Sequence, residues 1–265
     1  SQDYPHVEVH VIDGGSGDET IETLSRYEGR LSWISERDNG QSHAINKGWQ
    51  RSQGTILTWL NSDDYYEPGA ISAIVEKFAD SPQSAVVYGD LRYVDAAGAT
   101  VRCALVERDL FPWIYLSNVV GQPNAFIAKW CLEKVGVLDE TLHYVMDYDL
   151  WLRILDAGLK FVHVPQVVAN ARIHGSSKTF GQSGRHLAEV ASYLEGYYGS
   201  APSCAQPFRD ISLGYWHAAN GSYWSQRGQY RRAAQSFRRA IVHDPRYLRN
   251  RGILMAFVWA LIGDR

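Results

Sequence analysis

The sequence of 265 residues predicts an α/β protein with a smaller helical region at its C-terminal end. Short apolar strands alternate with helical segments four times before residue 90, which is typical of a parallel sheet with helices on both faces. A hairpin signal follows this alternation. After about residue 180 the strand signals stop and helical periodicity continues, so we expect a sheet domain followed by helices.

The first half of the chain supplies the alternating elements. Val7–Ile12 alternates and then becomes apolar, as expected for a strand that enters a core. Ser16 and Glu19 have the spacing of a capping box, which predicts a helix through Arg26. The elements expected next are a strand at Leu31–Ile34, a helix at Gln41–Arg51, a strand at Thr55–Leu60, a helix at Gly69–Ala79 and a strand at Ala85–Tyr88.

Beyond Gly89 the pattern changes. Arg92–Asp95 and Ala99–Arg102 flank the turn sequence Ala96-Ala97-Gly98, which predicts a hairpin. Helices at Lys129–Val135 and Asp147–Ala157 and a strand at Phe161–Val164 complete the first domain. A stretch containing glycine and serine, Gly175–Gly184, then precedes the helical region. We therefore place a first domain at residues 1–180 and a helical region at residues 181–265.

The helical region carries the signature of one tetratricopeptide-like helix pair at about residues 214–245. Its small and aromatic residues have the spacing of this repeat: Gly221, Trp224, Gly228, Tyr230, Ala233, Phe237, Ala240 and Pro245. One repeat cannot bury a continuous core, because several are needed. A helical hairpin packed on the main domain is therefore favoured over a peptide-binding array.

Composition places the chain among ordinary globular proteins, with 45% hydrophobic and 21% charged residues. Three cysteines without metal-type spacing leave an odd thiol, which favours a reducing, cytoplasmic compartment. Neither a signal peptide nor an apolar stretch of membrane-spanning length is seen.

The net charge of −3 is unevenly distributed. Residues 205–265 contain ten arginines and three acids, which gives +7 and leaves −10 for the rest. Such asymmetry suggests a basic segment that meets an anionic membrane leaflet or the acidic body of the protein. Ile253–Gly263 is apolar but too short to span a bilayer, and it suits either an interfacial helix or a helix that covers the hairpin. No recognition motif accompanies the basic cluster, so we expect no nucleic-acid partner.

Two adjacent carboxylates, Asp63 and Asp64, follow the apolar strand Thr55–Leu60. Carboxylates that repel each other at the end of a core strand are costly to desolvate unless a cation or another partner compensates them. In open α/β sheets the carboxyl ends of strands are also where ligands bind. A divalent cation bound there, together with phosphate oxygens, is one interpretation. The other is that one of them caps the helix expected near Pro68.

Six stretches taken together resemble glycosyltransferase family 2: Val11–Asp18, Ser35–Ser42, Ala44–Gly48, Trp59–Asp64, Met146–Arg153 and Arg172–Lys178. The similarity covers about residues 1–180 in the order of the family. It implies a GT-A fold, a Rossmann-like mixed sheet flanked by helices. It also implies an inverting transfer of a sugar from a nucleoside diphosphate donor, UDP-sugar first among them, to a hydroxyl of a glycan, polysaccharide or glycolipid acceptor.

The chain departs from the family in two places. Ser1–Pro5 looks like the end of the family's first helix, so we expect that one βα unit, on the order of 30 residues, is missing. An absent first strand would leave a sheet edge open, which leads us to expect weak nucleotide binding and self-association into a homo-oligomer. His43 stands where relatives usually carry Asp.

The resemblance assigns donor-site roles to five residues. It gives Asp13 the nucleobase, Asp38 the nucleoside and Lys47 a phosphate, whereas the residues alone equally allow a turn at Asp13 and a solvated helix lysine at Lys47. It makes Asp64 the ligand of Mn²⁺ or Mg²⁺ and directs Asp63 toward the ribose or the donor sugar. The cation would neutralise charge on the departing diphosphate.

The remaining assignments concern the catalytic base and two further donor-site residues. The resemblance makes Asp147 the general base that deprotonates the acceptor hydroxyl, with Asp149 as second choice. Asp147 also suits a helix start, where a negative charge is favoured by the helix dipole. Gln122 is expected to line the cleft close to the donor sugar. His174 is expected to contact the diphosphate or complete the metal site, or else to be structural.

Two classes of function follow. The first is a metal-dependent, inverting glycosyltransferase. The second is a non-catalytic, transferase-like binding or assembly module that has lost turnover. A nucleotidyltransferase is a weaker third, because its basic glycine-rich loop is not seen in the sequence.

Overall fold

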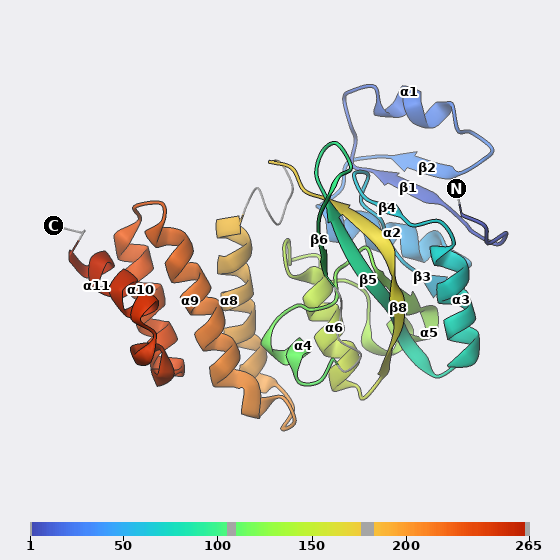
Figure 1. Ribbon diagram of the computed structural model, residues 1–265. Coiled ribbons are helices and arrows are strands. Elements are labelled where there is room, and N and C mark those ends of the chain that lie inside the picture. The colour runs from blue at the N-terminus through green and yellow to red at the C-terminus, as the bar shows by residue number, and fades with distance from the viewer. Residues whose placement is uncertain (1, 105–109, 176–182, 263–265) are drawn as a thin grey trace. The chain divides into compact units, whose positions relative to one another are not determined.

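The computed structural model describes residues 2–104, 110–175 and 183–262 (Figure 1). It divides into two compact units. Unit 1 comprises Ser1–Leu110 and Val120–Ile173, and unit 2 comprises Phe111–Val119 and His174–Arg265. The expected boundary between residues 180 and 181 lies outside the described residues.

Unit 1 begins with a small parallel sheet of its own. β1 (His10–Asp13) pairs with β2 (Ser32–Ser35), and α1 (Thr20–Ser25) connects them. The predicted capping box is wrong, because the Ser16 hydroxyl donates to Asp13 and does not cap α1. The carboxylate of Asp18 instead accepts from the backbone N–H of Thr20.

The main sheet of unit 1 is mixed. Its strand order is β3 (Ile56–Leu57), β7 (Ala125–Ala128), β5 (Ser84–Val94), β8 (Lys160–Arg172) and β4 (Tyr65–Tyr66), and β6 (Thr100–Ala104) also pairs with β5. Only β5 and β8 run parallel in this sheet. The alternation of strands and helices in the first half of the chain led us to expect one parallel sheet, and this expectation is wrong. The spacing of apolar segments predicts which segments are strands but does not determine which strands pair. The hairpin is confirmed as β5–β6, with Gly98 at φ 86° in its turn.

β8 is much longer than the predicted strand. It continues beyond Pro165, and its pairing with β5 jumps from Gly89 opposite Val164 to Asp90 opposite Val167. This β-bulge accommodates a proline that cannot donate to the ladder. Gly89 is required here, because a Cβ would lie 2.5 Å from the Val168 side chain. The extension carries the chain to Arg172, beside the candidate site.

Helices cover both faces of the main sheet. α3 (Ala70–Asp80) buries Ile74 and Phe78 against Val87 and Val168 on one face. On the other face, Trp151 of α6 (Met146–Asp156) contacts Phe161 and stacks on Trp59. The other helices of unit 1 are α2 (Gln41–Arg51) and α5 (Lys129–Val135), both with the predicted bounds.

Unit 2 is helical. Its elements are α4 (Trp113–Leu116), α8 (Ser183–Ser200), η1 (Gln206–Phe208), α9 (Arg209–Ser225), α10 (Tyr230–His243), η2 (Pro245–Arg249) and α11 (Arg251–Ile262). α9 and α10 form the expected helical hairpin, in which Gly221 lies against the Phe237 ring. Its likeness to a tetratricopeptide repeat stays a prediction. Within the described ranges, no helix has the length and apolarity needed to cross a membrane.

Candidate active site

A network of amides lies where β3 ends. The Asn61 Nδ2 atom donates to the Asp64 carboxylate at 3.1 Å and to the Gln122 side-chain oxygen at 2.9 Å. The Asn61 oxygen accepts from Gln41 of α2 at 2.7 Å, and Gln122 donates to the Trp59 carbonyl at 2.6 Å. One amide therefore joins three segments of unit 1, and the network brings together two predicted site residues, Asp64 and Gln122.

Asp64 is also held by the end of β8. Its Oδ1 atom accepts from the Arg172 backbone N–H at 3.0 Å, and the Arg172 side chain donates to the Asp63 carbonyl at 3.2 Å. β4 begins at the next residue, Tyr65, and pairs with Asn170. The alternative that Asp63 or Asp64 caps the following helix is wrong, because β4 intervenes and Gly69 is the N-cap of α3.

The Tyr93 phenol is influenced by the charges of two predicted site carboxylates. Burial raises the pKa of its phenol, the Arg102 guanidinium opposes that rise, and the negative charges of Asp147 and Asp64 add to it. The Arg102 guanidinium stacks 4.2 Å from the centre of the Tyr93 ring. Because both carboxylates influence one phenol, the predicted base and the predicted metal ligand belong to the same region of unit 1.

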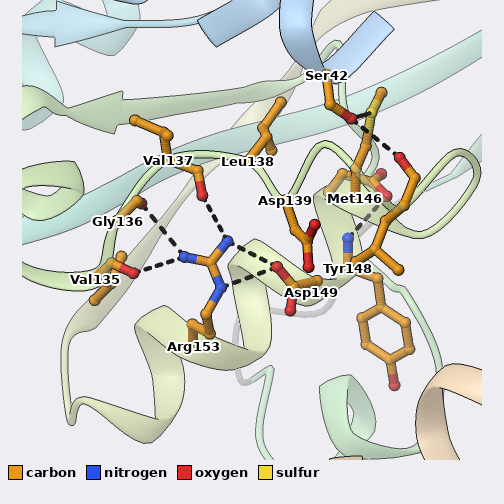
Figure 2. Close-up of polar contacts among 12 residues, drawn as sticks. Ser42, Val135, Gly136, Val137, Leu138, Asp139, Met146, Tyr148, Asp149 and Arg153 are labelled. Carbon is orange, nitrogen blue, oxygen red and sulfur yellow. Dashed lines mark hydrogen bonds and ion pairs between the residues drawn. The ribbon is translucent and has the colours of Figure 1, made fainter. Parts of the chain in front are cut away.

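Asp149, the second choice for the base, has a structural role. Arg153 binds its Oδ2 atom through Nε at 2.9 Å and Nη2 at 2.7 Å. The same guanidinium donates to the carbonyls of Val135, Gly136 and Val137 (Figure 2). Asp149 is buried, so its carboxylate is committed to this ion pair. Asp147, one helical position earlier than Tyr148, lies in the first turn of α6.

Asp13 organises the turn after β1. Its Oδ2 atom accepts from the backbone N–H groups of Gly15 and Ser16 and from the Ser35 hydroxyl, and its Oδ1 atom accepts from the Ser16 hydroxyl. The side-chain bonds from Ser16 and Ser35 hold the pKa of this carboxyl at about 2. The turn alternative is therefore observed.

Asp38 lies against the same turn. A Cβ on Gly14 would come within 2.6 Å of the Asp38 Oδ2 atom, so the glycine permits the approach of this side chain. The Oδ1 atom of Asp38 accepts from the Gly40 N–H at 2.8 Å, just before α2. Asp38 therefore lies beside the turn that Asp13 organises, at the carboxyl edge of the β1–β2 pair.

The structure does not test the predicted phosphate contacts of Lys47 and His174. The Lys47 ammonium pairs with Glu36 at 2.6 Å and lowers the pKa of that carboxyl. His174 lies two residues after the end of β8 and belongs to unit 2. Their phosphate roles stay predictions.

The acidic residues of this region bear on whether a divalent cation can bind. No group of three or more His, Cys, Asp or Glu side chains in the described ranges is arranged to hold a metal. Mg²⁺ commonly uses only one or two protein carboxylates and completes its shell with substrate phosphates and water. The Asn61 amide and the Arg172 backbone N–H orient the Asp64 carboxylate, and one oriented carboxylate of this kind fits a cation site that the donor diphosphate completes.

Sequence reasoning missed three residues of this region: Asn61, Tyr93 and Arg172. Asn61 stands two positions before Asp63, and Arg172 opens one of the six stretches quoted above, so a signal existed for both. Tyr93 had none, because it lies inside a hairpin strand that is far from the other residues in sequence.

Comparison with known proteins gives three kinds of match. Residues 1–126 match the model of Glycosyl transferase family 2. An uncharacterised glycosyltransferase of Rickettsia prowazekii (strain Madrid E) is 26% identical over 192 residues, covering 68% of this chain and 58% of that protein. The chondroitin synthase of Escherichia coli is 25% identical over 188 residues, covering 67% of this chain and 26% of that protein. The chain thus spans less than two thirds of the length of these relatives.

Solved structures agree on the fold. S. aureus TarS 1-349 in complex with UDP-GlcNAc matches with a TM-score of 0.63 at 15% identity, covering 99% of this chain and 81% of that one. The mannosyltransferase PcManGT from Pyrobaculum calidifontis, in complex with GDP-Man and Mn²⁺, matches with a TM-score of 0.62 at 18% identity, covering 99% and 77%.

The mixed sheet with helices on both faces and acidic residues at the strand ends defines a GT-A fold, to which helices are added at the C-terminal end. Within that class, residues 1–126 match glycosyltransferase family 2, and the relatives named above are glycosyltransferases or a chondroitin synthase.

Proposed function

We propose that this chain is an inverting glycosyltransferase that moves a sugar from a nucleoside diphosphate donor to an acceptor hydroxyl. The observation that carries the proposal is the network after β3, where Asn61 donates to both Asp64 and Gln122. The charges of Asp64 and Asp147 also both act on the Tyr93 phenol of β5. In this proposal, Asp64 binds the donor diphosphate through a cation, and Asp147 is the base for the acceptor hydroxyl.

In the proposed step, Asp147 accepts the proton of the acceptor hydroxyl as its oxygen attacks the anomeric carbon. The bond between that carbon and the diphosphate oxygen breaks, and the diphosphate leaves with the electron pair. Attack from the side opposite the leaving group inverts the configuration. Gln122, held by Asn61 and the Trp59 carbonyl, would bound the space for the donor sugar.

Asp64 would hold Mn²⁺ or Mg²⁺ together with the donor diphosphate, and Asp63 would face the ribose or the donor sugar. When bound, the cation would neutralise charge on the leaving diphosphate. The presence of Mn²⁺ with the structurally similar mannosyltransferase supports this choice of cofactor.

For the donor we propose a UDP-sugar, with Asp13 and Asp38 at the nucleoside and with Lys47 and His174 near the phosphates. The position of Asp38 against Gly14, in the turn that Asp13 organises, supports the nucleoside assignment. UDP-GlcNAc bound to one structural neighbour is consistent with it. The ion pair of Lys47 with Glu36 would have to open for Lys47 to reach a phosphate.

For the acceptor we propose a hydroxyl of a growing glycan, polysaccharide or glycolipid, in keeping with a relative that is a chondroitin synthase. A cytoplasmic location, peripheral contact with an anionic membrane and homo-oligomerisation are further proposals. The basic and apolar end of unit 2 supports the membrane contact.

A thermal-shift panel of UDP-, GDP- and dTDP-sugars, each with Mn²⁺ or with EDTA, tests this function. A ligand that binds only the folded state stabilises it by about 2.7 kcal/mol at a hundred times its Kd. We expect the UDP-sugar to raise the melting temperature only with Mn²⁺, and Asp64→Asn to abolish that rise. Asp80→Asn removes the same charge at the exposed C-terminal end of α3 and should retain the Mn²⁺-dependent rise in melting temperature.

Equal stabilisation in EDTA and Mn²⁺ would overturn the metal assignment. A rise with the GDP-sugar alone would overturn the choice of UDP. No response to any donor would favour the non-catalytic module.

A further inference from the structure

Unit 2 contains a cavity that the proposed chemistry does not use. Its volume is about 450 Å³, within the range of small-molecule sites. Its walls come from the first turns of α8, the end of α9 and the first half of α10: Gly184, Arg185, Ala188, Trp224, Arg232, Gln235 and Ser236.

The cavity is basic. Arg185 and Arg232 bring two guanidinium groups, and none of the described lining residues is acidic. Gln235 and Ser236 add an amide and a hydroxyl, which can donate to or accept from a ligand hydroxyl. An anion that enters meets two cations, and the described part of the wall contributes no competing carboxylate.

The aromatic part of the wall is rigid. Trp224 is half-buried and packs against the core of unit 2 around Phe237. It meets Tyr223 edge to face at 4.9 Å between ring centres. The Arg232 guanidinium stacks 4.8 Å from the centre of the Trp224 ring. Stacking fixes the plane of the guanidinium and leaves its N–H edge able to bind an anion in bidentate fashion.

The close approach of α8 shapes the opening. A Cβ on Gly184 would lie 2.5 Å from the Tyr223 ring, so only glycine lets the first turn of α8 rest on this aromatic residue. The Arg227 guanidinium also stacks on Tyr223, 3.8 Å from the ring centre. Arg185 on α8 and Arg232 on α10 therefore border one cavity although they are 47 positions apart in the sequence.

We propose that this cavity binds an acidic sugar or polyol-phosphate unit of the glycan chain that the enzyme extends. The two arginines would bind the carboxylate or phosphate, the Trp224 ring would contact the apolar face of the unit, and Gln235 and Ser236 would bind its hydroxyls. The inference rests on the proposed function, since it names the chemical class of the acceptor. Neutral chains lack the charge that two arginines compensate.

Binding of fluorescently labelled oligosaccharides, followed by anisotropy at low salt, tests the inference. The probes are a glucuronate-containing tetrasaccharide, a polyol-phosphate tetramer and neutral chitotetraose. We expect at least one anionic probe to bind, chitotetraose to bind at least tenfold more weakly, and the double variant Arg185→Gln/Arg232→Gln to lose at least tenfold in affinity. The matched control, Arg209→Gln/Arg238→Gln, removes two exposed arginines outside the cavity and should change affinity less than twofold.

Failure of both anionic probes to bind overturns the inference, as does an equal loss in the two double variants, which would indicate diffuse attraction. The same proteins are tested for stabilisation by UDP-sugar with Mn²⁺. Retained donor binding without glycan binding would reject the cavity alone, whereas loss of donor binding in the unaltered chain would reject the proposed function.

Discussion

Carboxylates of the same residue type have four different environments in unit 1. Asp13 accepts four hydrogen bonds in a turn, and Asp149 is committed to a buried arginine. Asp64 accepts an amide and a backbone N–H at a sheet edge, and Asp147 lies in the first turn of a helix near Tyr93. Surroundings therefore separate the structural acids from the candidate chemical ones.

Replacement of Asp147 tests the assignment of the base. Asp147→Asn keeps the shape of the side chain and removes its basicity, so turnover should fall about a hundredfold or more. The Mn²⁺-dependent thermal shift with donor should remain. Both are measured on the same preparation, by release of nucleoside diphosphate and by melting temperature.

Asp149→Asn is the companion variant. It should lower the melting temperature, because Arg153 loses its counter-charge, while turnover at a temperature well below melting stays within a few-fold. A collapse of donor affinity in Asp147→Asn, with turnover lost in Asp149→Asn, would exchange the two roles.

Acid should act on the Asp13 turn. The pKa of this carboxyl is lowered from 3.8 to about 2, so its stabilisation is complete above pH 4 and is lost as the pH falls toward 2. Asp13→Asn should reduce the free energy of unfolding by about 1–3 kcal/mol at pH 7, since charge-assisted hydrogen bonds disappear. The difference between the two proteins in urea unfolding should shrink between pH 4 and pH 2.5.

Glu76→Gln on the exposed side of α3 is the control and should leave the free energy of unfolding at pH 7 nearly unchanged. A difference for Asp13→Asn that stays constant down to pH 2.5 would contradict the role of the ionised carboxylate.

At the scale of elements, helices were predicted better than strands. α2 and α5 have the predicted bounds, because helical periodicity and flanking glycines are local signals. β3 contains two residues where six were expected, and β8 contains thirteen where four were expected. Strand length depends on the neighbouring strand, and the bulge that carries β8 past Pro165 needs Gly89 of β5.

The candidate site shows the same division. Asp64 and Gln122 were selected by resemblance and are joined in the structure, but Asn61, which joins them, was missed. A residue that binds a ligand leaves a motif, whereas a residue that positions others is visible only once the segments meet. The Glu36 partner of Lys47 and the four bonds to Asp13 likewise arise from tertiary contacts.

The connection between α6 and the end of α5 depends on Arg153 (Figure 2). Arg153→Met leaves the buried Asp149 carboxylate without its cation and three carbonyls without their donor, which should destabilise unit 1 by about 3–5 kcal/mol. Urea unfolding measures this change. Adding Asp149→Leu should recover part of the loss, because removal of both partners avoids an uncompensated buried charge.

Arg26→Met provides a matched control. Arg26 and Glu22 form an ion pair with the same spacing of four residues, but both side chains are about 70% exposed. An exposed pair of this kind contributes about 0.3–0.5 kcal/mol. Similar losses in the two arginine variants would show that the buried pair contributes no more than a surface pair.

At the scale of the whole molecule, the acidic sheet domain and the basic helical unit differ in their surfaces. α11 packs Ile253, Phe257 and Ala260 toward the core of unit 2. Its opposite side exposes Met255, Val258 and Trp259, with Trp259 64% exposed. Arginines at 246, 249 and 251 precede this apolar side. An apolar stripe beside cations is the combination that binds at an anionic membrane surface.

Co-sedimentation with liposomes tests this membrane contact. Vesicles containing anionic lipid should bind the chain, neutral vesicles should bind it weakly, and raising the salt should release it. Each positive charge near the surface contributes about 1 kcal/mol, so Arg246→Gln/Arg249→Gln/Arg251→Gln should lower partitioning about a hundredfold. Met255→Ser/Trp259→Ser should weaken binding to both lipid types, whereas Val242→Ser, an exposed apolar residue on α10, should not. Binding that ignores lipid charge and salt, or that survives both multiple variants, would assign the apolar side of α11 to packing alone.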